Sequence, residues 1–182
     1  MDVSVSLVFE EVNPMGDEWS GEEYSAGSGH HRSFDDWFLK RLPPQPGDVV
    51  VDLGCGSGEF TALVADIVRP GRVIGVDPDR SMLATARRHT HPGLTYLEGS
   101  AEELEGLVDP DSIDKVISRA MLHWLPVENY PRVFEAVLIV LRPGGWFHSE
   151  SGGAGNAPLM VSLLDHLAAR FGLAKPPGFP DA

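Results

Sequence analysis

The sequence predicts an α/β fold in which helices flank a doubly wound, mostly parallel sheet. Short β-branched apolar runs alternate with segments of helical periodicity between residues 33 and 172, and closely spaced glycines follow the first apolar run. An alternation of strands and helices needs crossover connections, which are right-handed and make neighbouring strands parallel. Ligands of such sheets bind beyond the carboxyl ends of the strands, so functional residues are expected there.

The individual elements follow from apolar periodicity and from residues that begin or end helices. Val49–Leu53 is the β-branched run typical of a strand buried on both faces, and Pro43 ends the helix expected before it. Asp79 is placed to cap the helix after the second strand. The expected strands are 49–53, 73–76, 94–97, 113–118 and 146–149. The expected helices are 33–42, 59–68, 80–89, 101–107, 130–140 and 158–171, with a turn at 142–145.

The predicted domain organisation is one core with an irregular segment at each side. Residues 1–32 are expected to form a leader that covers the cofactor site, residues 33–172 the core, and residues 173–182 an irregular tail. No secretory pattern opens the chain, and its longest apolar-rich run is far shorter than the roughly 20 residues that span a bilayer. Because Cys55 is the single cysteine, no internal disulfide or cysteine zinc site is expected. These features favour a soluble protein of the cytoplasm.

The charge balance argues against several classes of partner. The chain holds 14 Lys and Arg against 27 Asp and Glu, for a net charge of −13. Binding to a nucleic acid duplex or to an anionic membrane depends on clustered cations, and no such cluster is present in the sequence. We therefore expect neither partner, whereas a cationic ligand suits this charge.

The strongest motif is the glycine run Gly54-Cys55-Gly56-Ser57-Gly58, which follows the acid Asp52. Glycines permit unusual backbone angles and close approach of a ligand, and the helix that follows presents free N–H groups. A plain glycine turn is the alternative for the triplet alone. The acid Asp77 after the next strand lies near the expected distance of about 20 residues, where a carboxylate accepts ribose hydroxyls. The context therefore favours a nucleoside-type cofactor.

A dinucleotide cofactor is the competing interpretation of this motif. It would need a third glycine one position later, and Glu59 stands there. Acids at Asp52 and Glu59 would repel a pyrophosphate, so a nucleotide-dependent oxidoreductase is the less favoured reading.

These motifs resemble those of class I S-adenosylmethionine-dependent methyltransferases. The stretch 51–58 resembles the family's first motif, 76–79 its second, and 141–145 the turn before its fifth strand. The resemblance implies a Rossmann-like fold, S-adenosylmethionine as cofactor and transfer of its methyl group to an oxygen or nitrogen of a small-molecule acceptor. A protein that binds the cofactor without methyl transfer, as a regulatory or truncated form, remains an alternative.

A weaker resemblance concerns the subgroup. Residues 117–125 are similar to the corresponding stretch of trans-aconitate and malonyl-carrier-protein carboxyl methyltransferases, and Trp19, Tyr24 and Arg32 resemble the leader of the former. This similarity implies a small acceptor, such as a carboxylate. It also places His123 beside the acceptor, either as a general base or as part of the wall of the site.

The family resemblance implies a set of cofactor-binding residues. Asp77 would hold the ribose hydroxyls, Pro78 would flank the adenine, and Asp52 would lie near the cofactor's ammonium group or orient the loop. Serine replaces the family's usual acid at Ser100, where capping of the next helix is the alternative role. The implied cofactor-binding residues are Tyr24, Arg32, Asp52, Gly54, Cys55, Gly56, Asp77, Pro78, Ser100, Ala101 and Arg119.

The remaining expectations concern Cys55, Arg119, metals and the edge of the sheet. Cys55 is expected to be a small packed residue, and the side chain of Arg119 is expected to face the acceptor. No metal is expected, because adjacent His30 and His31 would not point the same way in a strand.

The family's last two strands are not apparent, so 146–149 would lie at an open sheet edge. We therefore expect a shortened family member or a truncated chain that pairs as a homodimer through this edge or lacks part of its acceptor pocket.

Overall fold

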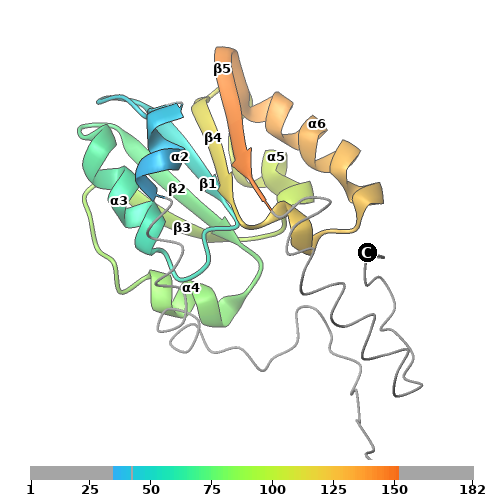
Figure 1. Cartoon of the computed structure of the whole chain (residues 1–182), viewed down its shortest axis with the longest axis horizontal. Coiled ribbons are helices and arrows are strands. Elements are labelled where there is room, and N and C mark those ends of the chain that lie inside the picture. Colours follow the sequence, from blue (N-terminus) through green and yellow to red (C-terminus); the bar gives the residue numbers. More distant parts are fainter. Residues whose placement is uncertain (1–34, 42, 152–182) are drawn as a thin grey trace, which may run out of the picture. The chain divides into compact units, whose positions relative to one another are not determined.

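The computed structural model describes residues 35–41 and 43–151, which form an α/β fold around a five-stranded sheet (Figure 1). The strand order is β3-β2-β1-β4-β5, and all neighbouring strands are parallel. The strands are β1 (Val49–Leu53), β2 (Arg72–Asp77), β3 (Leu94–Glu98), β4 (Ile113–Arg119) and β5 (Leu141–Glu150). The α-helices are α2 (Asp35–Arg41), α3 (Glu59–Val68), α4 (Arg80–Ala86), α5 (Leu104–Leu107) and α6 (Tyr130–Val140). Short 3₁₀ helices are η2 (Ala101–Glu103), η3 (Leu122–Trp124) and η4 (Val127–Asn129). The predicted Rossmann-like fold class is confirmed.

Two apolar cores lie on opposite faces of the sheet, because successive strand residues point to opposite sides. Val50 packs with Phe38 of α2 and with Val64 of α3, whereas Val51 packs with Leu104 of α5 and Val133 of α6. Both faces of β1 are therefore covered, as its uninterrupted apolar run predicts. This arrangement leaves the carboxyl ends of the strands as the place where loops can form a site.

Three elements differ from the sequence prediction. Helix α4 ends at Ala86 instead of residue 89, because the N–H groups of Arg88 and His89 turn back to carbonyls three residues earlier. The expected helix 101–107 consists of η2 followed by α5. Strand β5 begins at Leu141 and includes the expected turn 142–145 as an irregularity. Between the paired positions Ile113–Leu141 and Lys115–Trp146, β4 has one residue and β5 has four.

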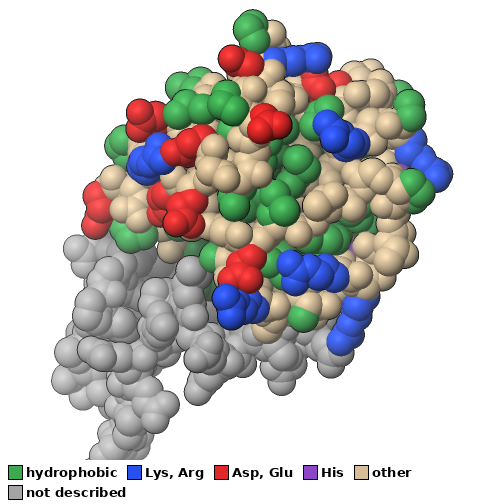
Figure 2. All heavy atoms as spheres, turned by 180° about the vertical axis from the view of Figure 1, so that it is seen from behind, with side chains coloured by type: hydrophobic (Ala, Val, Ile, Leu, Met, Phe, Trp, Pro, Cys, Tyr) green, Lys and Arg blue, Asp and Glu red, His purple; other side chains and the backbone are tan. Residues whose placement is uncertain are grey.

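In the part of the chain that the structure describes, β5 forms one edge of the sheet. The sequence predicts the fifth strand at an edge. The homodimer expected through this edge stays a prediction. The expected helix 158–171, the leader and the tail lie outside the described residues, and so does most of the second compact unit, residues 151–182. In the described part of the chain, no helix has the length and apolar character needed to cross a membrane. Figure 2 shows one face of the molecule, on which basic side chains stand between acidic and apolar ones.

Candidate functional site

The glycine loop joins the carboxyl end of β1 to the start of α3. The backbone N–H groups of Gly54 and Cys55 both donate to the carbonyl of Val76 on β2, at N···O distances of 2.8 and 3.0 Å. Gly54, Gly56 and Gly58 have φ values of 78°, 53° and 84°. These left-handed conformations are costly for residues with a Cβ, so the loop requires its glycines.

The loop is also closely surrounded by other side chains. A Cβ on Gly54 would lie 2.6 Å from the Cβ of Met121, and one on Gly58 would lie 2.6 Å from the hydroxyl oxygen of Tyr96. Met121 comes from the segment after β4, and Tyr96 comes from β3. Side chains from β3 and from the segment after β4 therefore pack closely against the loop, and Gly54 and Gly56 are its half-buried residues.

Asp77 ends β2 and ties the loop to it. Its Oδ2 accepts a hydrogen bond from the N–H of Gly56 at 2.8 Å, and its Oδ1 accepts one from the N–H of Asp79 at 2.9 Å. Burial raises the pKa of Asp77, and these two backbone bonds oppose that shift. A carboxylate has about four acceptor positions, so each oxygen can still accept a further hydroxyl.

Asp52 lies one residue before the end of β1 and is only 2% exposed. Its Oδ2 accepts a hydrogen bond from the hydroxyl of Thr61 on α3 at 2.7 Å. Burial raises the pKa of Asp52 to about 6, although the Thr61 hydrogen bond and the charge of Arg119 both lower it. Asp52 therefore faces α3, and both roles considered for it, beside the cofactor's ammonium group or in orienting the loop, stay predictions.

The thiol of Cys55 is buried in the same loop, and burial raises its pKa well above the usual range. A thiol held in its neutral form is a poor nucleophile. Its Sγ lies 3.0 Å from the position that a Cβ on Gly75 would take. Cys55 thus has the environment of a small packed residue.

Arg119 ends β4 at the same side of the sheet. Its guanidinium forms an ion pair with Asp35 of α2 and lies over the ring of Phe60, 4.2 Å from the ring centroid. Arg119 thus contacts α2 and α3, and the expectation that its side chain faces the acceptor stays a prediction. The Arg119 charge still reaches the site, since it lowers the pKa of Asp52.

Ser100 and Pro78 occupy the loops that follow β3 and β2. The N–H and the hydroxyl of Ser100 both donate to Oε2 of Glu103, at 3.3 and 3.0 Å, in the capping arrangement of η2. Ala101 is buried beside it, and Pro78 is exposed. The capping role considered for Ser100 is therefore present in the structure.

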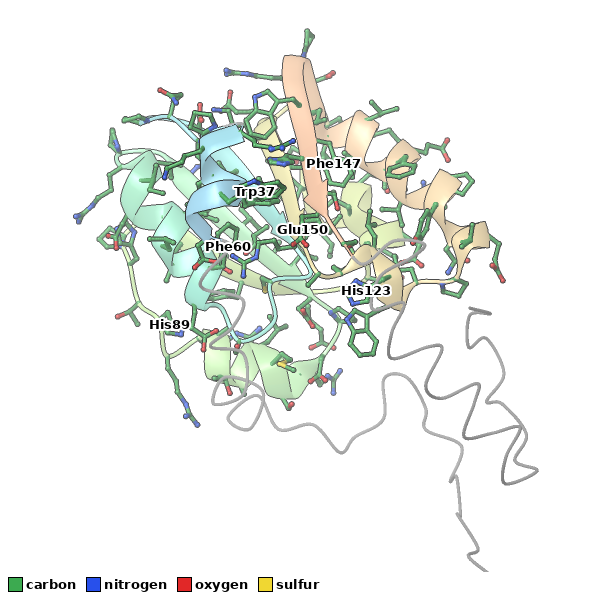
Figure 3. All side chains as sticks on the ribbon, viewed as in Figure 1. Trp37, Phe60, His89, His123, Phe147 and Glu150 are labelled. Carbon is green, nitrogen blue, oxygen red and sulfur yellow. The ribbon has the colours of Figure 1, made fainter. Side chains whose placement is uncertain are left out.

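His123 lies in η3, just beyond the carboxyl end of β4, and near Glu150 at the end of β5 (Figure 3). Burial lowers the pKa of His123, while the charge of Glu150 acts in the opposite direction. The imidazole is thus mainly neutral at pH 7, a state that can accept a proton or a hydrogen bond. The predicted site residues Tyr24 and Arg32 lie outside the described residues.

Sequence reasoning did not assign roles to four residues that shape this site: Thr61, Tyr96, Met121 and Asp35. Each acts through a partner that is distant in sequence, such as the 35–119 ion pair. Apolar or polar periodicity cannot show such pairs. Two internal glycines, Gly58 and Gly75, were the available sign that a large side chain approaches the backbone there.

The fold and the loop define a Rossmann-like protein with a nucleoside-type site at the switch point of its sheet. Residues 50–145, just over half of the chain, match the family described as "Methyltransferase domain". The chain belongs to this family, and the predicted class of S-adenosylmethionine-dependent methyltransferase is confirmed at that level.

Individual relatives agree with this class. The chain is 40% identical over 104 residues to a trans-aconitate 2-methyltransferase of Deinococcus radiodurans, covering 57% of this chain and 38% of that protein. It is 32% identical over 155 residues to one of Streptomyces coelicolor, covering 81% of this chain and 50% of that protein. A crystal structure of an S-adenosylmethionine-dependent methyltransferase from Mesorhizobium loti is 35% identical, with a TM-score of 0.53, and the match covers 62% of this chain and 49% of that one. The chain thus spans half or less of these three proteins.

Proposed function

We propose that this chain binds S-adenosylmethionine at the glycine loop and transfers its methyl group to a carboxylate oxygen of a small organic acid. The observation that carries the proposal is the hydrogen bond between Gly56 and Asp77, because it joins the glycine loop and a carboxylate in one site. The relatives named trans-aconitate 2-methyltransferase support the acid as acceptor.

The residues of the site fit this cofactor. The left-handed loop conformation requires glycines, and Asp77 has unused acceptor positions for two ribose hydroxyls. We propose that Pro78 and Ala101, which follow the neighbouring strands β2 and β3, contact the adenine. When bound, S-adenosylmethionine supplies a methyl group on a sulfonium, which is a strong electrophile.

The negative charge of the site favours a cationic cofactor. Asp52 and Asp77 are both buried next to the loop, and both have raised pKa values. A positive charge near them would lower these pKa values and would be stabilised in return, because charges interact more strongly away from water.

A carboxylate acceptor needs no base to become nucleophilic, so alignment and exclusion of water are the main tasks of the protein. We propose that His123 lines the acceptor side of the site, where a neutral imidazole would orient one oxygen of the acid. Arg119 contributes positive charge near the same end of β4 while it holds Asp35. We propose a small-molecule acceptor and not a nucleic acid, in keeping with the net charge of −13.

An acceptor panel with radiolabelled S-adenosylmethionine tests the proposal. It holds trans-aconitate and other small di- and tricarboxylates in one arm, and amines and phenols in the other. We expect base-labile methyl esters in the acid arm only, and less product with Asp77→Asn at a cofactor concentration that does not saturate the wild type. Methylated amines or phenols would overturn the acceptor class. Binding of S-adenosylhomocysteine without product from any acceptor would favour a cofactor-binding protein without methyl transfer, and binding of NAD alone would favour an oxidoreductase.

A further inference from the structure

One row of residues runs across three strands beneath the glycine loop. Asp52 of β1 is the register partner of Gly75 on β2, and Gly75 is the partner of Tyr96 on β3. This row faces the same side as Val50 and Val73, which pack with α3. Gly75, the central residue of the row, has no side chain, so the side chains of Asp52 and Tyr96 can approach each other across β2.

Tyr96 fills the space that Gly75 leaves. A Cβ on Gly75 would lie 2.7 Å from Cδ1 of the Tyr96 ring, so no other residue fits at that position without moving the ring. The ring therefore lies across β2, and its hydroxyl reaches the loop after β1. There it donates to the carbonyl of Gly58 at an O···O distance of 3.4 Å.

A second hydroxyl joins this contact from α3. Thr61 donates its proton to Asp52 at 2.7 Å. Burial raises the pKa of Tyr96, and a side-chain hydrogen bond between Tyr96 and Thr61 opposes that shift. Since the Thr61 proton is engaged by Asp52, Tyr96 is the donor in the bond between the two hydroxyls.

We infer that Tyr96 and Thr61 are positioning residues, whose hydroxyls hold the glycine loop and the Asp52 carboxylate in the conformation that binds the cofactor. The chain of groups runs from Asp52 through Thr61 and Tyr96 to Gly58, which is the last residue of the loop. The Tyr96 hydroxyl reaches the carbonyl of Gly58 and the Thr61 hydroxyl reaches the carboxylate of Asp52, so both act through these groups. The inference rests on the proposed function for its ligand, whereas the hold on the loop is a property of the free protein.

Two isosteric variants test the inference: Tyr96→Phe and Thr61→Val. Each removes one hydroxyl and keeps the shape, so the fold is expected to persist. Thr95→Val is the matched control, because Thr95 is exposed on the neighbouring position of β3 and faces the other way. Thr61→Ser keeps the hydroxyl and serves as the rescue variant. Circular dichroism at the assay temperature confirms that each variant is folded.

The first measurement is hydrogen–deuterium exchange of the amides of residues 54–58 in the free protein. We expect faster exchange in Tyr96→Phe and Thr61→Val and wild-type exchange in Thr95→Val and Thr61→Ser. Unchanged exchange in both isosteric variants would overturn the hold on the loop. This result does not depend on any ligand.

The second measurement is the affinity for S-adenosylhomocysteine by calorimetry. Loss of a neutral hydrogen bond predicts binding about three- to tenfold weaker in Tyr96→Phe and Thr61→Val, with recovery in Thr61→Ser. Faster exchange with unchanged affinity would overturn the claim that the loop's conformation sets binding. A wild-type chain that binds no S-adenosylhomocysteine would overturn the proposed function, and the exchange data would then still decide whether the hydroxyls hold the loop.

Discussion

The backbone N–H of Gly56 donates a hydrogen bond of 2.8 Å to Oδ2 of Asp77, so the end of β2 fixes the loop that follows β1. The carboxylate has two tasks in this account: it holds the loop and it is proposed to accept the ribose hydroxyls. A change at Asp77 should therefore affect both stability and cofactor affinity.

Asp77→Asn tests this double role. An amide group in place of one oxygen meets the N–H of either Gly56 or Asp79, so one donor loses its acceptor. We expect S-adenosylhomocysteine affinity to fall by about 1.5–3 kcal/mol and the free energy of unfolding to fall by about 1–3 kcal/mol. Calorimetry and urea unfolding measure the two quantities.

The control is Asp79→Ala, two residues away. Asp79 caps α4 by accepting from the N–H groups of Ser81 and Met82, so its loss should cost about 1 kcal/mol of stability and leave affinity unchanged. Equal losses of affinity in the two variants would contradict the assignment of the ribose to Asp77.

The raised pKa of Asp52 predicts that the free energy of unfolding depends on pH. Its pKa is raised from 3.8 to about 6 in the folded chain, so the folded state binds more protons than the unfolded state between these values. Its contribution is therefore most favourable below pH 4 and is lost as pH rises through about 6. The groups that face Asp52 are Thr61, Arg119 and Asp77.

Asp52→Asn isolates the effect of the Asp52 charge on stability, because the amide oxygen can still accept the hydrogen bond from Thr61. At pH 8 we expect the variant to be more stable than the wild type by up to about 3 kcal/mol, and near pH 4 we expect the difference to vanish. Denaturant unfolding of both proteins at the two pH values measures it. A variant that is less stable than the wild type at pH 8 would show that the buried charge is better compensated than its surroundings indicate.

Gly54→Ala tests the crowding of the loop. The new Cβ combines a φ of 78° with a position 2.6 Å from the Cβ of Met121, so we expect a loss of about 2–4 kcal/mol in stability. Gly144→Ala has a similar φ of 85° and open space around it, so it should lose only the conformational part, about 1–2 kcal/mol. Thermal unfolding compares the two, and equal losses would mean that Met121 simply moves aside.

His123→Ala tests the acceptor side of the site. We expect turnover with a saturating acid acceptor to fall about tenfold, because a misplaced acceptor reacts more slowly, and S-adenosylhomocysteine affinity to stay within about twofold. His89→Ala is the control, since His89 lies after α4 and away from His123 (Figure 3). Lost cofactor affinity with intact turnover would move His123 to the cofactor site.

The sequence predicted the parts of this fold that depend on local patterns. The run Val49–Leu53 and the helix Glu59–Val68 have the predicted bounds, because their apolar spacing and flanking residues are unambiguous. The end of α4 was wrong by three residues, since residues 87–89 continue the helix pattern although the backbone tightens into a turn. Arg142–Gly145 was expected as a turn before the strand, and the structure includes it in β5 as an irregularity between two paired positions.

The site was predictable where one short motif contains it. The glycine loop and the strand that follows it connect Gly54 to Asp77 over a short stretch of sequence. The spacing of this stretch was enough to single out the glycines and Asp77. The engagement of Arg119 with Asp35 and the contact of Tyr96 with Gly58 depend on strand register and on how α2 and α3 pack. Neither register nor packing is encoded in a local pattern, so these contacts required the structure.

The most direct test of the central claim is the melting temperature of the wild-type chain with S-adenosylhomocysteine. A ligand that binds only the folded state stabilises it by about 2.7 kcal/mol at one hundred times its dissociation constant. We predict a rise in melting temperature that increases with ligand concentration, that is reduced in Asp77→Asn, and that NAD does not produce. No rise at millimolar S-adenosylhomocysteine, together with a rise caused by NAD, would contradict the account.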